Sequence, residues 1–539
     1  MLQKIKTNWL YISFFSVYFL IGINIYKDYG ISFDEVYART IGQVNAVYMV
    51  GLIDKDFSEK LRTENGIPKL HEFNDKDHGA TFDIVALIPE IVFQIRDKQQ
   101  IYYMRHLLNF LFYFISAIFV FLVSNNVLKN KNWALFSVLL FVLMPKFFAE
   151  SFYNSKDITF LSAFIIAAYF CNKLITKQNL STILIASFAI ALASTMRLMG
   201  FILPAITTCF MLLESLIIHR EKIKRTFLWI LLFCISTFSF LYLMWPLIWE
   251  NTFDNLLMTF LNMSKYPWNH QVYYMGKLTL AAQLPSHYLI VLFLISTPIP
   301  YTIIFLIGIA ISAYKWFQNP KRIFERDHLS LLFYFSLFAF PLFYIIESNA
   351  VVYSGWRHVY FIYFGFVIIT TYSAIQIKNM LTKKFNSKGL IACYVIAIFM
   401  FGSIAIRIVK MHPFQNVYFN FLVPKNGPFE YDYWATSYAN GLRYVLRNNP
   451  DKTIKIYFYG SHFAQYILTK SERNRIVMVE NFEKADFYFS NYLVGRNYYI
   501  PHNNYKKYYE LIIDGNQILC VFKNTKRNAN YAISNENSK

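Results

Sequence analysis

Long apolar stretches recur along the first 410 residues, separated by short polar turns. Each is close to the roughly 20 mainly apolar residues that a helix needs to cross the hydrocarbon core of a bilayer. The pattern predicts about eleven membrane-spanning helices. Their expected ranges are 8–26, 106–127, 132–150, 157–175, 180–196, 199–218, 226–246, 287–314, 329–346, 357–376 and 389–409.

Positive charges occupy alternate turns between these stretches, as they do in multi-pass membrane proteins. Lys and Arg resist translocation, so the pattern predicts a cytoplasmic N-terminus and, with an odd number of spans, an extracytoplasmic C-terminus in the plasma membrane. The first apolar stretch follows basic residues, as in a signal peptide. Because it is long and lacks a small-residue cleavage site, we interpret it as a retained span.

Three long segments are expected on the outer face, namely 27–105, 247–286 and the chain after about residue 410. The first includes DIVALIPEIVF, a run that is too short to cross the membrane and is typical of a helix lying at the interface. The second mixes aromatic and polar residues, as interfacial segments do.

From about residue 430 the pattern becomes that of a soluble domain. TIKIYFYG, RIVMVE and ADFYFSNY predict strands, and ELIIDGNQILCVFK predicts a hairpin that turns at Asp514-Gly515-Asn516. FAQYILTK has a helical pattern between them. We therefore expect a polytopic α-helical membrane module over residues 1–410, a small C-terminal extracytoplasmic α/β domain over 411–525, and a disordered tail over 526–539.

Composition supports the membrane assignment. The 539 residues are 56% hydrophobic and only 16% charged, which a soluble globular protein rarely shows. The formal net charge of +20 is explained by basic loops near anionic headgroups. No basic stripe indicates nucleic-acid binding, and the five cysteines form neither a disulfide framework nor a zinc-type spacing.

Several charged residues fall at the outer ends of the predicted spans, where burial near lipid is costly and function is the usual reason. In a folded bundle they could converge on one cavity at the outer leaflet. Such a cavity suits a substrate that is part lipid and part polar, for example a polyprenyl phosphate that carries a sugar. The candidate residues are Asp34, Glu35, Arg105, His106, Lys156, Asp157, Arg197, Arg357 and His358.

The residue types suggest roles for this cluster. A guanidinium matches phosphate oxygens, so Arg105, Arg197 and Arg357 are candidates for the donor phosphate. An acceptor hydroxyl needs a base, and Asp34 is the first candidate. Neighbouring side chains on a helix point about 100° apart, so Glu35 is expected to orient a nearby Arg, Lys or backbone group. Possible further substrate contacts are His106, Lys156 and His358.

The order of several motifs resembles that of a known family. FDEVY, RHLLNFL, MPKFFAESFYNSKDITFL and STMRLMGFILP follow one another as they do in membrane glycosyltransferases of the protein O-mannosyltransferase and aminoarabinose transferase type, which are related to glycosyltransferase family 39. The resemblance covers roughly residues 8–376, and bacterial members include tails similar to residues 412–445. It implies a GT-C fold and a polyprenyl-phosphate sugar donor.

The resemblance also implies residue roles. Asp34 matches the acidic residue that acts as, or beside, the catalytic base, and Glu35 completes the acidic pair. Asp157 matches a second acidic position, and Arg105 matches a basic residue near the leaving phosphate. An inverting, mannosyltransferase-like reaction is implied, with a protein, lipid or glycan as acceptor. No cofactor or metal is expected, because the spacing of the charged residues in 71–78 fits no standard metal site.

Each signal also has a structural alternative. Asp34 and Glu35 could begin an exposed helix, Asp157 could cap one, and Arg105 could anchor a span at the interface. A transporter or flippase for lipid-linked sugars is the alternative function. Transporters usually place ionisable residues near the midplane and show paired halves, whereas these acids lie at span ends and no internal repeat is visible.

Overall fold

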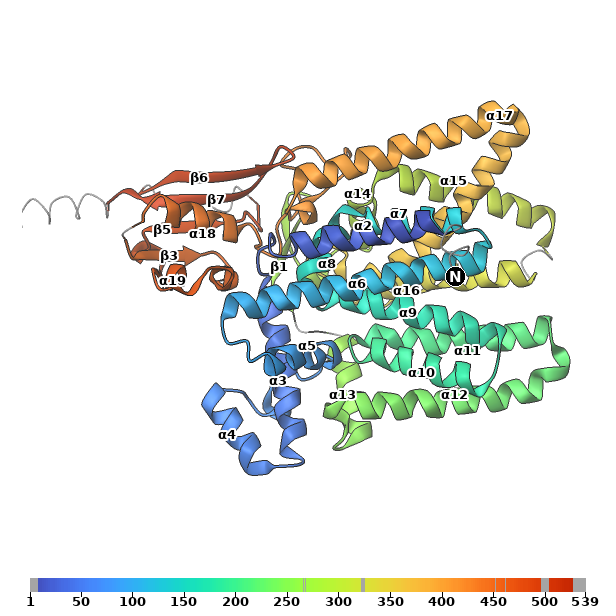
Figure 1. Cartoon of the computed structure of the whole chain (residues 1–539), viewed down its shortest axis with the longest axis horizontal. Helices are drawn as coiled ribbons and strands as arrows, with labels where there is room; N and C mark the ends of the chain where they lie inside the picture. Colours follow the sequence, from blue (N-terminus) through green and yellow to red (C-terminus); the bar gives the residue numbers. More distant parts are fainter. Residues whose placement is uncertain are drawn as a thin grey trace, which may run out of the picture.

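The computed structural model describes residues 8–264, 266, 268–320, 325–450, 452–460, 462–495 and 504–526. A bundle of long, roughly parallel helices carries a small α/β domain at one of its ends (Figure 1). The chain is a multi-pass α-helical membrane protein with a C-terminal sheet domain, which confirms the fold class that the hydrophobic pattern predicted.

Among the described residues, seven helices are long and apolar enough to cross a membrane, or eight if the bent pair α7 and α8 forms one span. The helices α2 and α10 are apolar but shorter. The bundle comprises α2 (Trp9–Ile25), α6 (Lys98–Leu128), α7 (Lys131–Val142), α8 (Pro145–Tyr153), α9 (Asp157–Thr176), α10 (Leu180–Ser194), α11 (Ile202–Ile217), α12 (Ile223–Met244), α14 (Tyr288–Ser296), α15 (Ile299–Gln318), α16 (Arg326–Glu347) and α17 (Tyr363–Met411).

Four of the predicted spans differ in detail from these helices. The predicted span 132–150 bends by 70° just before Pro145. The predicted span 287–314 is two helices, because Pro298 has no N–H to donate to the carbonyl one turn earlier. The last two spans are joined in α17, which departs from helical geometry at Asn386.

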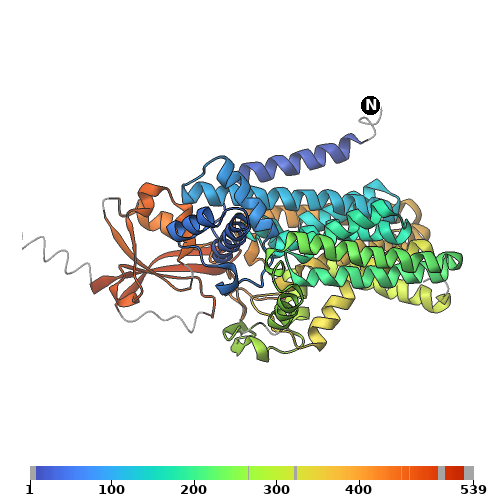
Figure 2. The same cartoon turned by 90° about the horizontal axis from the view of Figure 1, so that it is seen from below.

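The long segments lie together at one end of the bundle, called the loop end below (Figures 1 and 2). The short connections between α6 and α7, between α9 and α10 and between α11 and α12, which are rich in basic residues, lie at the opposite end (Figure 1). The assignment of the loop end to the extracytoplasmic face stays a prediction. Besides the α/β domain, the loop end comprises α3 (Phe33–Gly51), α4 (Lys55–Asn65), α5 (Thr81–Val92), α13 (Thr252–Ser264), β1 (Gln271–Tyr274) and β2 (Lys277–Leu280).

The α/β domain is a five-stranded mixed sheet in the order β4-β3-β5-β7-β6. The strand β3 runs parallel to β4 and β5, whereas β7 is antiparallel to β5 and β6. The predicted strands and the hairpin are confirmed. The strands are β3 (Ile454–Phe458), β4 (Ile476–Met478), β5 (Phe487–Ser490), β6 (Tyr505–Ile513) and β7 (Asn516–Asn524).

One helix packs on this sheet, and one predicted helix is wrong. Leu442 and Val445 of α18 (Tyr438–Arg447) join a core with Ile456 and Phe489 of the sheet. FAQYILTK instead forms the 3-10 turn η9 (Phe463–Ile467) and the start of α19 (Lys470–Arg473), because Thr469 is extended and caps α19. Apart from Lys526, the predicted tail lies outside the described residues.

Residues 412–437, called the connecting segment, run from α17 to α18 across the loop end. The side-chain amide of Asn420 donates to the carbonyls of Leu294 and Thr297 at 2.7 and 2.9 Å. The carbonyl of Leu294 would normally accept from residue 298, so Asn420 replaces the hydrogen bond that Pro298 cannot make. The connecting segment is therefore packed into the bundle, and the domain boundary near residue 410 stays a prediction.

Two glycine variants, at Gly79 before α5 and at Gly402 in α17, should differ in their effect on stability. A Cβ on Gly79 would lie 1.6 Å from the carbonyl oxygen of Thr195, whereas a Cβ on Gly402 would meet no atom within 4 Å. Gly79→Ala should destabilise the protein by about 1–3 kcal/mol through overpacking. Gly402→Ala should be neutral or slightly stabilising, because alanine is the better helix former. Apparent melting temperatures in detergent measure both, and equal values would contradict the close packing at Gly79.

Candidate active site

The first turn of α3 fixes the two adjacent acids. Ser32 precedes the helix in an extended conformation, and its backbone N–H donates to Glu35 Oε2 at 2.8 Å in a capping box. Glu35 is fully buried, and its Oε1 lies 3.0 Å from Nε2 of His106. Asp34 is only 8% exposed. The first turn of α3 is therefore buried and not exposed.

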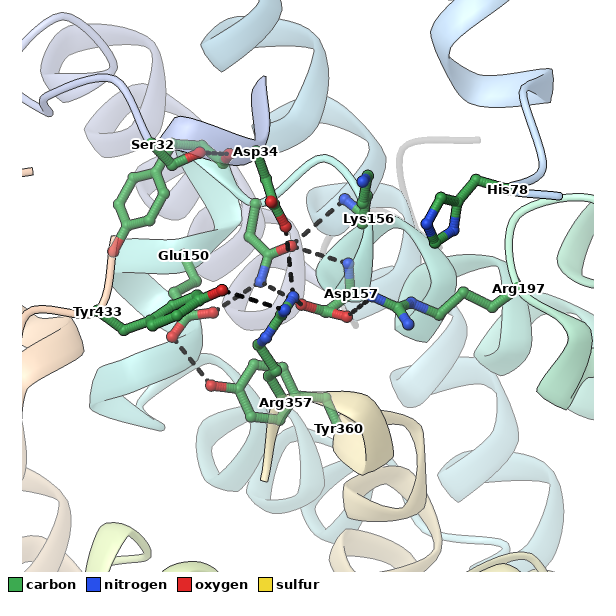
Figure 3. A network of polar contacts seen from close by, with 12 residues as sticks. Ser32, Asp34, His78, Glu150, Lys156, Asp157, Arg197, Arg357, Tyr360 and Tyr433 are labelled. Atoms are coloured by element: carbon green, nitrogen blue, oxygen red, sulfur yellow. Dashed lines mark hydrogen bonds and ion pairs between the residues drawn. The ribbon is translucent and has the colours of Figure 1, made fainter. Parts of the chain in front are cut away.

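Four of the predicted site residues form one ion cluster, called the central cluster (Figure 3). Nη1 of Arg357 lies 3.3 Å from Oδ2 of Asp34 and 3.2 Å from Oδ2 of Asp157. The guanidinium of Arg197 pairs with Oδ1 of Asp157. The four side chains come from α3, from the start of α9, from the turn before α11 and from the turn before α17. Helix ends that are distant in sequence therefore meet at the loop end.

Aromatic rings hold Arg357 in place from the other side. Its guanidinium carbon lies 5.1 Å from the ring centres of Tyr353 and Tyr433 and 5.3 Å from that of Trp434. Nη2 also donates to the hydroxyl of Tyr433 at 3.4 Å. A buried cation needs such partners, because desolvation alone costs several kcal/mol. Arg357 is 5% exposed and has both carboxylates and ring faces around it.

Polar side chains between α8 and α9 orient Asp157. The side chain of Asn154 accepts from the backbone N–H of Asp157 at 2.8 Å and donates to Oδ2 of Asp157 at 3.1 Å. It also donates to Glu150 at 2.8 Å, and the hydroxyl of Tyr360 donates to Glu150 at 2.9 Å. Asn154 thus accepts from an N–H at the N-terminus of α9, while the Asp157 carboxylate contacts Asn154 and the two arginines and does not cap the helix.

The remaining predicted residues surround the central cluster. Arg105 pairs with Asp83 of α5, and both are buried. Burial raises the pKa of Asp83 to about 6, against the lowering effect of Arg105 and Lys156. The ring of His358 packs edge-on against Tyr353, 4.6 Å between centres. Three predicted residues therefore lie in two ion pairs outside the central cluster. These pairs are Arg105 with Asp83 and Glu35 with His106.

Several site residues were not predicted from the sequence. His78 lies beside Arg197 in Figure 3, and burial together with the cations Lys156 and Arg197 holds its pKa well below the usual range. Glu150 had a visible signal, since a carboxylate inside a predicted apolar span is unusual. Asn154, Tyr360 and Tyr433 carried no signal that distinguishes them from ordinary packing residues.

The charged loop at residues 71–78 has structural partners. The carboxylate of Asp77 accepts from the hydroxyl of Thr259 at 2.9 Å and from the amide of Asn262 at 2.8 Å. His71 lies 3.4 Å from Glu250. In the described ranges, no group of three or more His, Cys, Asp or Glu side chains is arranged to hold a metal ion. The loop is fastened to α13 and to the segment before it.

Part of the chain matches a known protein family. Residues 84–249 match the family model described as dolichyl-phosphate-mannose-protein mannosyltransferase. The chain contains a domain of this glycosyltransferase family. The matched range includes Arg105, Glu150, Asp157 and Arg197, and it confirms the resemblance that the motifs indicated. Asp34 and Arg357 lie outside the matched range, on either side of it.

Three solved structures are similar to the chain at low identity. ArnT from Cupriavidus metallidurans in the apo state shares 12% identity over 96% of this chain and 98% of its own, with a TM-score of 0.49. The same enzyme bound to undecaprenyl phosphate shares 11% over 95% and 98%, with a TM-score of 0.48. The oligosaccharyltransferase AglB from Archaeoglobus fulgidus shares 13% over 89% and 65%, also at 0.48. No curated protein matches the chain.

The buried carboxyl group of Glu430, in the connecting segment, should make the stability of the protein depend on pH. Its Oε1 accepts from the backbone N–H of Tyr273 at 3.3 Å, and burial raises its pKa to about 8. A raised carboxyl pKa contributes stability that is present at low pH and is lost as the pH rises through the folded value. Between pH 7 and pH 9 the protein should lose roughly 1 kcal/mol of stability from this group.

The matched variant for this prediction is Glu430→Gln, which cannot ionise. The difference in apparent melting temperature between the wild type and the variant should change in favour of the variant from pH 7 to pH 9. Thermal unfolding in detergent at both pH values measures it. A difference that stays constant over this range would show that Glu430 does not titrate there.

Proposed function

We propose that the chain transfers a sugar from a polyprenyl-phosphate-linked donor to an acceptor hydroxyl, at the loop end and on the extracytoplasmic face of the plasma membrane. The observation that carries the proposal is the shared contact of Asp34 and Asp157 with Arg357, next to Arg197. A base and a phosphate-binding group within one cluster are what such a transfer requires. The family of the matched domain supports the donor class.

Asp34 is the proposed general base. Its Oδ2 faces Arg357, and in the described part of the chain no hydrogen bond or ion pair is recorded for Oδ1. Oδ1 is thereby left to accept the proton of the acceptor hydroxyl. As the hydroxyl oxygen forms its bond to the anomeric carbon, the bond from that carbon to the phosphate oxygen breaks and its electron pair leaves with the lipid phosphate. A single displacement of this kind inverts the anomeric carbon.

The arginines are the proposed binding groups for the departing phosphate. Nε atoms of Arg105, Arg197 and Arg357 are buried and have no hydrogen-bond partner among the described residues. Negative charge grows on the phosphate oxygens in the transition state, so preorganised N–H donors lower the barrier most when they are already fixed. Asp157 fixes two of them, because it pairs with both Arg197 and Arg357.

The other predicted residues receive supporting roles. Glu35 holds the start of α3 through Ser32 and meets His106, so it positions Asp34 without contacting the acceptor itself. Lys156 begins the turn into α9 beside the cluster (Figure 3). His358 lies next to Arg357 in sequence and packs on Tyr353. Lys156 and His358 are proposed substrate contacts at the rim of the site.

Asp34→Asn is the first test of the proposal. Loss of the base should lower the rate of sugar transfer per folded molecule by a factor of roughly 100 to 10,000. The protein should still be expressed, because Arg357 keeps Asp157 as a partner, but its melting temperature should fall because one carboxylate of a buried ion cluster is removed. The matched control is Asp56→Asn, because Asp56 holds the same second position in α4 but is exposed. Consumption of the lipid-linked sugar in detergent is the measurement.

The same assay separates the proposal from the transporter alternative. An enzyme consumes the lipid-linked sugar in detergent, where no two compartments exist, and a flippase does not. Wild-type protein that leaves the donor intact with every acceptor offered would refute the proposal. Near-normal transfer by Asp34→Asn would keep the reaction but remove Asp34 as its base.

Arg197→Gln tests the phosphate site. Removing a fixed donor to the leaving group should lower kcat by roughly 100- to 1,000-fold, with a smaller change in KM, because the charge develops in the transition state. Arg225→Gln is the control, since Arg225 is exposed at the opposite end of the bundle, at the start of α12. Steady-state kinetics with the lipid-linked donor measure both. A change confined to KM would place Arg197 in ground-state binding alone.

A further inference from the structure

A cavity lies against Arg357 at the loop end, and aromatic side chains dominate its wall. It is bounded by β1, by α8, by α14, by the turn before α17 and by the connecting segment. Most of these elements lie outside the range that matches the family model. The lining that matters here consists of Tyr274, Trp356, Arg357, Asn416, Glu430 and Trp434.

Two buried lining residues carry polar atoms without partners. Tyr274 is 5% exposed and Asn416 is 2% exposed. The hydroxyl of Tyr274 and Oδ1 of Asn416 have no hydrogen-bond partner among the described residues. Leaving a buried polar atom unsatisfied costs about 1–3 kcal/mol, so two residues with such atoms in the lining of one cavity support a ligand that supplies the missing partners.

The two sides of Arg357 differ in chemistry. Arg197, Lys156 and His78 lie on one side, while Tyr433, Glu150 and Tyr360 lie on the other (Figure 3). Arg197 and Lys156 make the first side cationic, so it suits the phosphate of the donor. The second side adjoins the cavity, where rings alternate with carboxyl and amide groups. Besides the rings, the lining includes the carboxyl groups of Glu150 and Glu430 and the ammonium group of Lys146. Donors and acceptors on one aromatic wall suit a ligand that is rich in hydroxyl groups, which both donate and accept hydrogen bonds.

We infer that this cavity holds the sugar that is transferred, and that Tyr274, Asn416 and Glu430 determine which sugar is accepted. The assignment rests on the proposed function and adds the site that selects the donor. Sugar rings present C–H faces that pack on aromatic rings, and hydroxyls that both donate and accept hydrogen bonds. Trp356 and Trp434 offer the rings, while Tyr274, Asn416 and Glu430 offer the polar atoms.

The position of the cavity fits the reaction geometry. Arg357 lines the cavity and also contacts Asp34, the proposed base. A sugar in the cavity with its phosphate on the cationic side therefore has its anomeric carbon near Arg357 and Asp34. The connecting segment supplies Asn416, Glu430 and Trp434, so the residues that choose the sugar are separate from those that carry out the transfer.

The test compares lipids with and without a sugar. Dissociation constants in detergent are measured by tryptophan fluorescence for undecaprenyl phosphate and for undecaprenyl phosphate that carries mannose, glucose, galactose or N-acetylglucosamine. The sugar with the largest affinity gain over the bare lipid serves as the probe.

Tyr274→Phe should reduce that gain roughly five- to tenfold, because one hydrogen bond to the sugar is lost, and should leave bare-lipid affinity unchanged. Glu430→Gln should change the order of preference among the sugars.

A matched control separates ligand binding from folding. The hydroxyl of Tyr301 on α15 is also buried without a partner among the described residues, but Tyr301 does not line the cavity. Tyr301→Phe should leave both affinities unchanged. Neither variant should lower the melting temperature, since each removes an unsatisfied polar atom and keeps the ring. A purely structural role for Tyr274 therefore predicts no loss of affinity at all.

The other outcomes are also decisive. If Tyr274→Phe and Glu430→Gln bind both lipids as the wild type does, the cavity does not hold the sugar. If they bind the donor normally but show a raised KM for the acceptor, the cavity belongs to the acceptor and the assignment is overturned. Wild-type protein that binds neither lipid would refute the proposed function, and the cavity assignment with it.

Discussion

The buried guanidinium of Arg357 is the interaction on which the loop end depends. It lies between the carboxylates of Asp34 and Asp157 and under three aromatic rings. Taking any one of these ions out of water alone would be unfavourable, and removing one partner of a buried pair typically costs about 3–5 kcal/mol. Since the partners come from α3, α9 and the connecting segment, the ion cluster fixes the relative positions of elements that the hydrophobic pattern leaves unspecified.

The connecting segment explains how the α/β domain joins the bundle. Asn420 donates to the Leu294 carbonyl that Pro298 leaves unpaired, and the hydroxyl of Tyr433 accepts from Arg357. Nearer the domain, the carboxylate of Asp432 accepts from Ser437 N–H at 2.9 Å and from Asn416 at 3.1 Å. The connecting segment therefore replaces a hydrogen bond that is missing between α14 and α15, contacts the site and leads into the sheet domain. A change in the domain has a direct route to the site through these contacts.

The sequence predicted those features that follow from local pattern. Helices lie at the predicted apolar stretches, and Asp34, Asp157, Arg197 and Arg357 were expected together because each is a charge at the same end of a span. The partners that orient them could not be predicted. Asn154, Tyr360 and Tyr433 are residue types that usually pack or cap. The bend at α8, the turn before α17 and the path of the connecting segment bring them to the cluster. The helix predicted for FAQYILTK was wrong for a similar reason, because Thr469 caps a new helix and interrupts the helical pattern.

The charge distribution around Arg357 connects the ion cluster with the proposed reaction. Asp157 lies between Arg197 and Arg357, so one carboxylate offsets part of the charge of two guanidinium groups and leaves an excess of positive charge on that side. Lys156 adds a further positive charge on this side, where His78 is neutral. The field across Arg357 therefore favours negative charge on the arginine side. Movement of an electron pair from an anomeric carbon toward a phosphate on that side is aligned with this field, which is how a fixed charge arrangement stabilises a transition state more than a ground state.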